Sequence, residues 1–161
     1  MIKEVKGDIL KLIKELEEQD KSVVVLHQCN CFNTLGRARG IAGLLDKAYP
    51  QIATVDQATI KGDPNKLGTY TKARIHERLW IINVYGQYNY GMNKNIVYTD
   101  YNALGQGLVE AVNEVLQFIP NAAFVLPKYI GSGLSNGSYE IIRNTILEPI
   151  FSNLDSYFVY I

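Results

Sequence analysis

The sequence predicts a three-layer α/β/α domain with a mixed central sheet. Short apolar, strand-like segments alternate with helical segments along the chain, which is the pattern of α/β proteins. Residues 22–28 form a run rich in valine, which suits a strand that is covered on both faces. Two strand-like segments are separated only by His76 and Glu77, so we expect one antiparallel hairpin within the sheet.

The first half of the chain predicts two strands and three helices. Residues 2–5 alternate as a short strand, and residues 7–20 carry apolar side chains at i, i+3, i+4 and i+7, as an amphipathic helix does. After the strand at 22–28, a helix begins near Gly40 and ends before Pro50, because proline disfavours helical geometry at the preceding residue. A further helix over residues 51–60 leads into a turn.

The second half of the chain predicts the hairpin, two more helices and two more strands. Either Thr99 or Asp100 is the expected N-cap of the first of these helices. In order, the expected segments are strands 69–75 and 78–86, a loop at 87–98 rich in Tyr and Asn, helix 99–119, strand 122–129 broken at Pro127, loop 130–138, helix 139–151 and strand 156–161. Because no repeat, low-complexity tract or linker interrupts this order, residues 1–161 predict a single domain.

The composition is that of a globular protein. Hydrophobic residues make up 47% of the 161 residues, and Lys+Arg and Asp+Glu both number 16, so no net charge draws the chain to nucleic acid or membrane. An anionic ligand would therefore need a local site. The first residues mix charge with apolar side chains, unlike a signal peptide, and we expect a cytoplasmic monomer.

The two cysteines do not predict a metal site. Cys29 and Cys31 are one residue apart, which places their Cα atoms badly for a mutual disulfide. Together with His27 they lack a second ligand pair at the spacing that zinc sites use. A catalytic thiol is also unsupported, because the only other histidine, His76, lies in a charged turn. We expect packing roles for both cysteines, no metal and no cofactor.

Two glycine-containing loops follow buried strands and lead into helices. They span residues 29–40 and 130–137. In α/β sheets ligands bind outside the carboxyl ends of the strands, where backbone N–H groups and a helix N-terminus can hold an anion. One glycine turn often serves backbone geometry alone. Two such loops, the first next to His27 and Asn30, predict a diphosphate site.

The ordered motifs resemble the macro domain family. They are "GDIL" at residue 7, "HQCNC" and "GIAGLLDKAYP" around the first loop, "NVYGQYNYG" and "TDYNAL" in the middle, and "LPKYIGSGLSNGSYEII" near the end. The chain looks most like the branch of ADP-ribose-1″-phosphate phosphatases found in phages, bacteria and fungi. The resemblance implies an enzyme that binds ADP-ribose 1″-phosphate and hydrolyses it to ADP-ribose and phosphate. A non-catalytic ADP-ribose binder, or a hydrolase that removes ADP-ribose from macromolecules, is the alternative.

The resemblance also implies which residues bind the nucleotide. Asp8 and Ile9 match the motif that holds adenine, although Asp8 is also a plausible helix cap. Asn30 matches the asparagine that holds the distal ribose, a task suited to an amide with donors and an acceptor. The implied phosphate-binding residues are Gly40, Ile41, Ala42, Gly131, Ser132, Gly133, Leu134 and Ser135. Tyr129 or Tyr139 would cover adenine or ribose.

Three residues match positions implicated in turnover. His27 would be the general acid or base, Asp100 would orient it or the attacking water, and Ser132 would contact phosphate. Each has a plainer role too: His27 as a buried, hydrogen-bonded core residue, Asp100 as a helix cap, and Ser132 as a small loop residue.

The first loop departs from the family pattern. Where relatives read Gly-x-Gly-Ile-Ala, this chain reads "GRARGIA", which is two residues longer and adds Arg37 and Arg39. These guanidinium groups either clamp a phosphate bidentately or lie in solvent. Ser135 stands where the branch that cleaves glutamyl-ADP-ribose esters has an aspartate, which disfavours that chemistry.

Overall fold

The computed structural model describes all 161 residues, and its six strands form one sheet in the order β1-β6-β5-β2-β4-β3. The strands are β1 (Ile2–Lys6), β2 (Val23–Cys29), β3 (Tyr70–His76), β4 (Leu79–Tyr85), β5 (Ala123–Pro127) and β6 (Ser156–Tyr160). All neighbouring pairs are parallel except β3 and β4, which are antiparallel. The predicted mixed sheet is confirmed.

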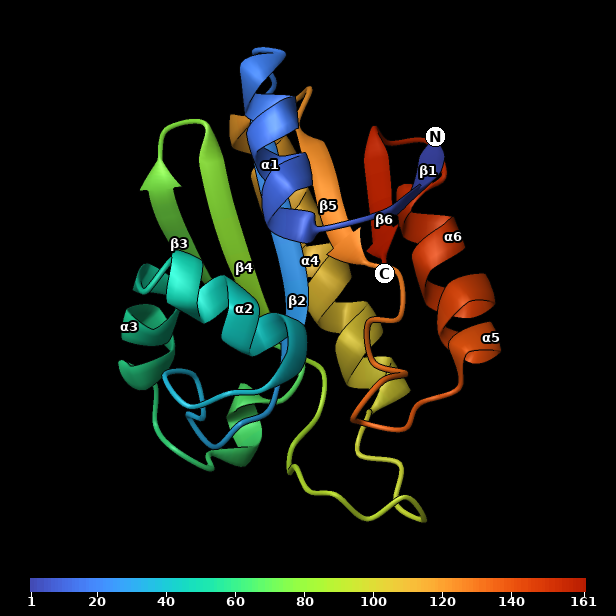
Figure 1. The fold of residues 1–161 in the computed structure, drawn as a ribbon. Coiled ribbons are helices and arrows are strands. Elements are labelled where there is room, and N and C mark those ends of the chain that lie inside the picture. Colours follow the sequence, from blue (N-terminus) through green and yellow to red (C-terminus); the bar gives the residue numbers. More distant parts are fainter.

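Helices cover both faces of this sheet (Figure 1). They are α1 (Ile9–Glu18), α2 (Gly40–Ala48), α3 (Gln51–Gln57), the 3₁₀ turn η1 (Pro64–Lys66), α4 (Tyr101–Phe118), α5 (Tyr139–Ile142), the π-helical segment η2 (Arg143–Leu147) and α6 (Glu148–Phe151). None of them has the combination of length and apolar character that crossing a membrane would require.

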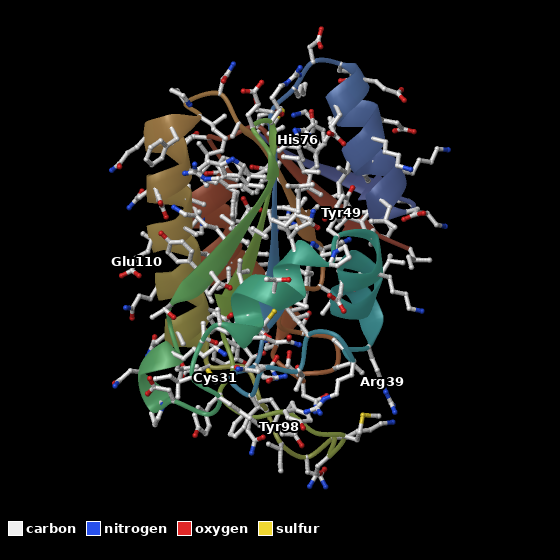
Figure 2. All side chains as sticks on the ribbon, turned by 90° about the vertical axis from the view of Figure 1, so that its left-hand side faces the viewer. Cys31, Arg39, Tyr49, His76, Tyr98 and Glu110 are labelled. Atoms are coloured by element: carbon white, nitrogen blue, oxygen red, sulfur yellow. The ribbon has the colours of Figure 1, made fainter.

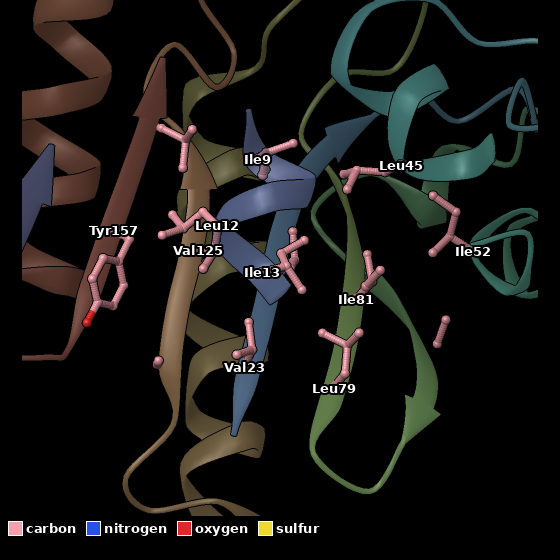
Figure 3. Close-up of a cluster of buried hydrophobic side chains, with 14 of the residues drawn as sticks. Ile9, Leu12, Ile13, Val23, Leu45, Ile52, Leu79, Ile81, Val125 and Tyr157 are labelled. Atoms are coloured by element: carbon pink, nitrogen blue, oxygen red, sulfur yellow. The ribbon is translucent and has the colours of Figure 1, made fainter. Parts of the chain in front are cut away.

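The core consists of two apolar clusters, one on each face of the sheet. Along β2, Val23 and Val25 pack into the cluster under α1, α2 and α3 (Figure 3), whereas Val24 and Leu26 pack into the cluster under α4, α5 and α6. This alternation is the two-residue period of a strand. Because β2 pairs with β4 on one side and β5 on the other, its β-branched residues are fully buried, as the sequence predicts.

The last helix differs from the expected continuous helix over residues 139–151. The structure has a π-helical segment between α5 and α6, and Pro149 lies in the first turn of α6. Proline has no backbone N–H to donate to the carbonyl four residues earlier. Just before the proline, the backbone N–H of Glu148 donates to the carbonyl of Arg143, five residues earlier, as in a π turn.

The parallel strands point their carboxyl ends to the same edge of the sheet. Five strands, paired in the order β1-β6-β5-β2-β4, are mutually parallel, so the segments that follow them meet there. The antiparallel β3 brings its last residue, His76, to the opposite end of the molecule, away from Arg39 and Tyr98 (Figure 2).

Candidate functional site

A cleft of ≈ 1090 Å³ lies at the carboxyl edge of the sheet. Three loops surround it, which we call the first loop (residues 30–39), the central loop (residues 86–100) and the second loop (residues 128–138). The ends of β1 and β6 complete one end of the cleft. The cleft is therefore built from the segments that follow five parallel strands, where α/β proteins bind ligands.

The first loop leads into the N-terminus of α2, which faces the cleft. Gly40 has φ +63, a backbone conformation that glycine adopts without strain. The first hydrogen bond of the helix runs from the N–H of Gly43 to the carbonyl of Arg39 (3.3 Å). The N–H groups of Gly40, Ile41 and Ala42 thus have no acceptor in the helix, and all three residues line the cleft.

Asn30 sits at the start of the first loop with its side chain partly engaged. Its Nδ2 donates to Thr34 Oγ1 (2.8 Å), and its Oδ1 accepts from the N–H of Phe32 (2.9 Å). An amide has two N–H donors and an oxygen with two lone pairs. One donor and one lone pair of Asn30 therefore remain for a ligand in the cleft that this residue lines.

The second loop forms the opposite wall. Gly131 has φ +75, and the hydrogen bonds within the loop use the N–H groups of Ser132, Asn136 and Gly137. This leaves the N–H groups of Gly133, Leu134 and Ser135 without a backbone acceptor, in residues that line the cleft. The arrangement provides a second set of amide donors for an anion.

His27 lies at the cleft floor but is almost wholly buried, with 2% exposure. Its Nε2 is 2.6 Å from Asn83 Oδ1. Since Asn83 Nδ2 donates to the carbonyl of Ile52 and to Thr71 Oγ1, Asn83 Oδ1 must accept from His27, which leaves Nδ1 as the acceptor. Burial lowers the pKa of His27 to about 4, so the imidazole is neutral near neutral pH.

Three predicted site residues do not line the cleft. Asp100 caps α4, accepting from the N–H of Ala103 (3.0 Å), and lines a separate hollow of ≈ 660 Å³ on the outer side of the central loop. The Ser132 hydroxyl donates to the carbonyl of Tyr129 (3.0 Å). Tyr139 packs behind Tyr129 with ring centroids 5.2 Å apart. Only Tyr129 of these two rings lines the cleft.

Asp8 both caps a helix and lines the cleft. One carboxylate oxygen accepts from the N–H of Leu10 (2.9 Å) at the start of α1. Asp8, Ile9 and Tyr160 line the same end of the cleft, because β1 and β6 are paired neighbours. The two roles that the sequence offers for Asp8 are therefore geometrically compatible.

The charged groups of the cleft are few and unevenly placed. Asp8 is the only lining residue with a carboxylate side chain, and Arg37 and Arg39 are the only lining residues with cationic side chains, since His27 is neutral. Arg37 and Arg39 are exposed and make no ion pair, whereas Arg78 and Arg143 do. The loop that departs from the family pattern thus brings two free guanidinium groups to the rim.

The cysteines are buried and free. Cys29 Sγ lies 3.8 Å from both ring nitrogens of His27, but burial raises the pKa of Cys29 and raises that of Cys31 to about 11. Neither thiol forms a thiolate near neutral pH. No cluster of three or more His, Cys, Asp or Glu side chains is arranged to hold a metal ion.

A buried polar network beneath the first loop was not predicted. Lys66 and Asp56 form an ion pair (3.4 Å) with both side chains less than 5% exposed. Tyr85 donates its hydroxyl to Asp56 (2.8 Å), and Lys66 also donates to Asn33 in the first loop. Asn83 joins this network through Thr71, whose Oγ1 bonds to both Asn83 Nδ2 and the Tyr85 hydroxyl. As a polar residue inside an apolar strand, Asn83 was the one signal of the network in the sequence. Asp56 and Lys66 sit in ordinary polar segments and gave none.

No family model matches the sequence. A curated relative, the "Uncharacterized 17.5 kDa protein in tk-vs intergenic region" of Enterobacteria phage T4, is 31% identical over 159 residues, which cover 96% of this chain and 93% of that protein. A solved structure of a protein of unknown function from Bacteroides thetaiotaomicron superposes with a TM-score of 0.78 at 21% identity, covering 99% of this chain and 98% of that one.

Two solved macrodomains have the same fold. The macrodomain protein from Streptomyces coelicolor gives a TM-score of 0.71 at 16% identity and covers 100% of this chain and 99% of its own. The macrodomain of Thermus aquaticus DarG gives 0.68 at 14% identity, with 100% and 98% covered. The chain therefore belongs to the same family as the 17.5 kDa protein of phage T4, and its fold is that of the macrodomains.

Proposed function

We propose that this protein binds ADP-ribose in the cleft at the carboxyl edge of its sheet. The observation that carries the proposal is the meeting of Asp8, Asn30 and the free amides of two glycine loops around one cavity. Its volume of ≈ 1090 Å³ is slightly larger than the roughly 300–1,000 Å³ of most small-molecule sites. A dinucleotide-sized ligand, with a sugar at each end of a diphosphate, needs a cleft of this size.

Each part of the nucleotide has a matching part of the cleft. Adenine lies at the end formed by β1 and β6, where the second carboxylate oxygen of Asp8 accepts from its amino group. The diphosphate lies between the N-terminus of α2 and the second loop, since both offer unpaired N–H donors and the helix dipole favours negative charge. The distal ribose lies against Asn30.

Ligand-dependent unfolding tests this proposal. ADP-ribose at a hundred times its dissociation constant should raise the free energy of unfolding by about 2.7 kcal/mol, measured by thermal shift and confirmed by calorimetry. Ribose 5-phosphate and AMP, which each offer only part of the ligand, serve as controls and should bind more weakly. Absence of any stabilisation by millimolar ADP-ribose would refute the proposal.

Hydrolysis of a phosphate ester on the distal ribose is the second candidate function. The observation that favours it is the pair of unpaired guanidinium groups, Arg37 and Arg39, on the loop that begins with Asn30. Arginine binds phosphate oxygens through paired N–H donors, so these groups suit a phosphate beyond the diphosphate. ADP-ribose 1″-phosphate is such a ligand.

The surroundings of His27 restrict its part in this reaction. The neutral imidazole carries its one proton on Nε2, where Asn83 Oδ1 accepts it (2.6 Å), so only Nδ1 is open to take up a proton. His27 is thus assigned as the base whose Nδ1 takes a proton from the attacking water, while its Nε2–H remains hydrogen-bonded to Asn83. Asp100 and Ser132 need a rearrangement of their loops to take part.

Release of inorganic phosphate from ADP-ribose 1″-phosphate tests the second candidate. The wild type should release phosphate, and His27→Ala should still bind ADP-ribose but release phosphate at least about a hundredfold more slowly. A wild type that binds without releasing phosphate is a binding module. Release of ADP-ribose from a modified macromolecule, with the small phosphate ester left intact, would instead identify the hydrolase alternative.

A further inference from the structure

Gln28 is the second-last residue of β2, next to His27 in sequence, and its side chain lies on the other face of the sheet. Successive residues of a strand point to opposite faces, so His27 faces the helices α2 and α3 while Gln28 faces α4 and the second loop. Its side chain is half-buried beneath the central and second loops. Neither the nucleotide-binding residues nor the turnover residues described above include it.

The amide of Gln28 meets oxygen atoms from both loops. Its Nε2 is 2.9 Å from Gln87 Oε1 and 3.0 Å from Thr99 Oγ1, which are at the two ends of the central loop. It is also 3.2 Å from Ser135 Oγ in the second loop. One side chain anchored in the middle of the sheet therefore contacts both walls on this side of the cleft.

Two glycines pack directly on this side chain. A Cβ atom on Gly86 would lie 2.4 Å from Gln28 Oε1, and one on Gly131 would lie 3.4 Å from the same oxygen. The first distance is impossible for a real Cβ. At Gly86 the backbone of the central loop thus approaches the amide more closely than a residue with a side chain would allow, and at Gly131 the second loop is within ordinary contact distance.

The two loops are also bonded to each other around this point. Thr99 Oγ1 donates to the carbonyl of Gly131 (2.6 Å), the N–H of Tyr98 donates to the carbonyl of Ser135 (2.8 Å), and Asn136 Nδ2 donates to the carbonyl of Ile96 (2.9 Å). These hydrogen bonds join the two loops to each other, and Gln28 connects both of them to β2.

The other end of the amide argues against a role in packing alone. Gln28 Oε1 is buried without any hydrogen-bond partner in the protein, and a buried acceptor without a partner lowers stability. A methionine or leucine would fill the same space without this loss. The side chain is a glutamine, we infer, because its Nε2 can donate hydrogen bonds to the two loops.

We propose that Gln28 is a positioning residue that fixes the central and second loops over the sheet, so that the cleft has its binding shape before the ligand arrives. This inference rests on the proposed function, because the ligand whose binding it assists is ADP-ribose. A preformed wall spares the ligand the cost of ordering two loops, and the gain appears in affinity and in the association rate.

The test is Gln28→Met, which keeps the length of the side chain and removes both N–H donors. We expect ADP-ribose affinity to fall about tenfold, which corresponds to 1.4 kcal/mol. In the free protein, backbone amides of residues 87–98 and 131–137 should exchange hydrogen faster, while amides of β2 and α4 keep their protection. Thr99→Val, which removes one acceptor and the bond to Gly131, should show the same pattern more weakly.

Ser156→Ala is the matched control. It removes another buried hydroxyl with two hydrogen bonds, to the carbonyls of Phe151 and Leu154, at the start of β6 and away from the cleft. It should lower stability without changing ADP-ribose affinity or the exchange of either loop. Unchanged loop exchange in both Gln28→Met and Thr99→Val would overturn the inference, as would an unchanged affinity.

The two proposals fail in different ways. If Gln28→Met does not fold, Thr99→Val alone decides, by the same two measurements. If the wild type does not bind ADP-ribose, the proposed function is refuted, and hydrogen exchange of the free protein still shows whether Gln28 fixes the loops.

Discussion

Asp8 illustrates how one side chain can serve the fold and the ligand at once. Its carboxylate caps α1 through the N–H of Leu10, and it is also the one acidic side chain on the cleft wall. A carboxylate has two oxygens and accepts about four hydrogen bonds. The helix cap uses one of these positions and leaves the others free for a ligand, which in our proposal is adenine.

Two substitutions of Asp8 separate these roles. Asp8→Asn keeps a good N-cap but replaces the charged acceptor with a neutral amide, so stability should hold and ADP-ribose affinity should fall about tenfold. Asp8→Ala should lose the same affinity and also about 1 kcal/mol of stability. Urea unfolding and calorimetry measure both. Equal affinity of wild type and Asp8→Asn would show that Asp8 only caps the helix.

His27 makes stability depend on pH in a definite direction. Its pKa is about 4 in the folded protein because burial disfavours the charged form, and about 6.5 in the unfolded chain. The unfolded state therefore takes up the proton first as pH falls. The contribution of His27 to the free energy of unfolding is therefore complete above about pH 6.5 and is lost as the pH falls from about 6.5 to about 4.

A His27→Gln variant checks this. Between about pH 7 and about pH 5, the wild type should lose about 2 kcal/mol more unfolding free energy than the variant, which has no imidazole to protonate. Urea denaturation at the two pH values gives both numbers. Parallel losses in wild type and variant would mean that His27 titrates normally in the folded state.

At the scale of an element, α2 can pack closely against the first loop because residue 43 is a glycine. A Cβ on Gly43 would lie 2.3 Å from the carbonyl oxygen of Ala38, which is backbone and cannot swing aside. The position of Arg37 and Arg39 relative to the helix N-terminus depends on this close approach.

Gly43→Ala should therefore move the first loop. Although alanine favours a helix by about 1 kcal/mol, we expect the displaced loop to weaken ADP-ribose binding by about tenfold. Gly105→Ala in α4 is the control, because its Cβ would only touch Ile146 at 3.9 Å. That variant should gain about 0.5–1 kcal/mol and bind normally. Full affinity in Gly43→Ala would contradict this view of the loop.

The sequence predicted the elements well because each depends on local signals. The start of α2 at Gly40, its end before Pro50 and the hairpin around His76 are properties of neighbouring residues. Contacts between distant residues left no such signal. Nothing local shows that Gln28 would meet Thr99 and Ser135, or that the chain would bury Lys66 against Asp56. The motifs placed Asp8 and Asn30 at the cleft, whereas Asp100, Ser132 and Tyr139 lie off its surface.

For the whole molecule, the cleft and the core should be one cooperative unit. Phe151 is fully buried and packs on Phe124 and Phe158, with ring centroids 5.8 and 5.9 Å apart, on the face opposite α2. Phe151→Leu should cost about 1–2 kcal/mol. ADP-ribose at a hundred times its dissociation constant should restore about 2.7 kcal/mol, as seen in thermal unfolding. Two separate transitions, with ligand moving one alone, would disprove the cooperativity.

The place of β6 between β1 and β5 has a consequence for synthesis on the ribosome. β1 emerges first, yet the strand that pairs with it, Ser156–Tyr160, is made more than a hundred residues later. Until then β1 has no neighbour in the sheet, and Asp8 has no Tyr160 beside it. We therefore expect nascent chains that stop short of residue 156 to remain protease-sensitive at their N-terminus and unable to bind nucleotide.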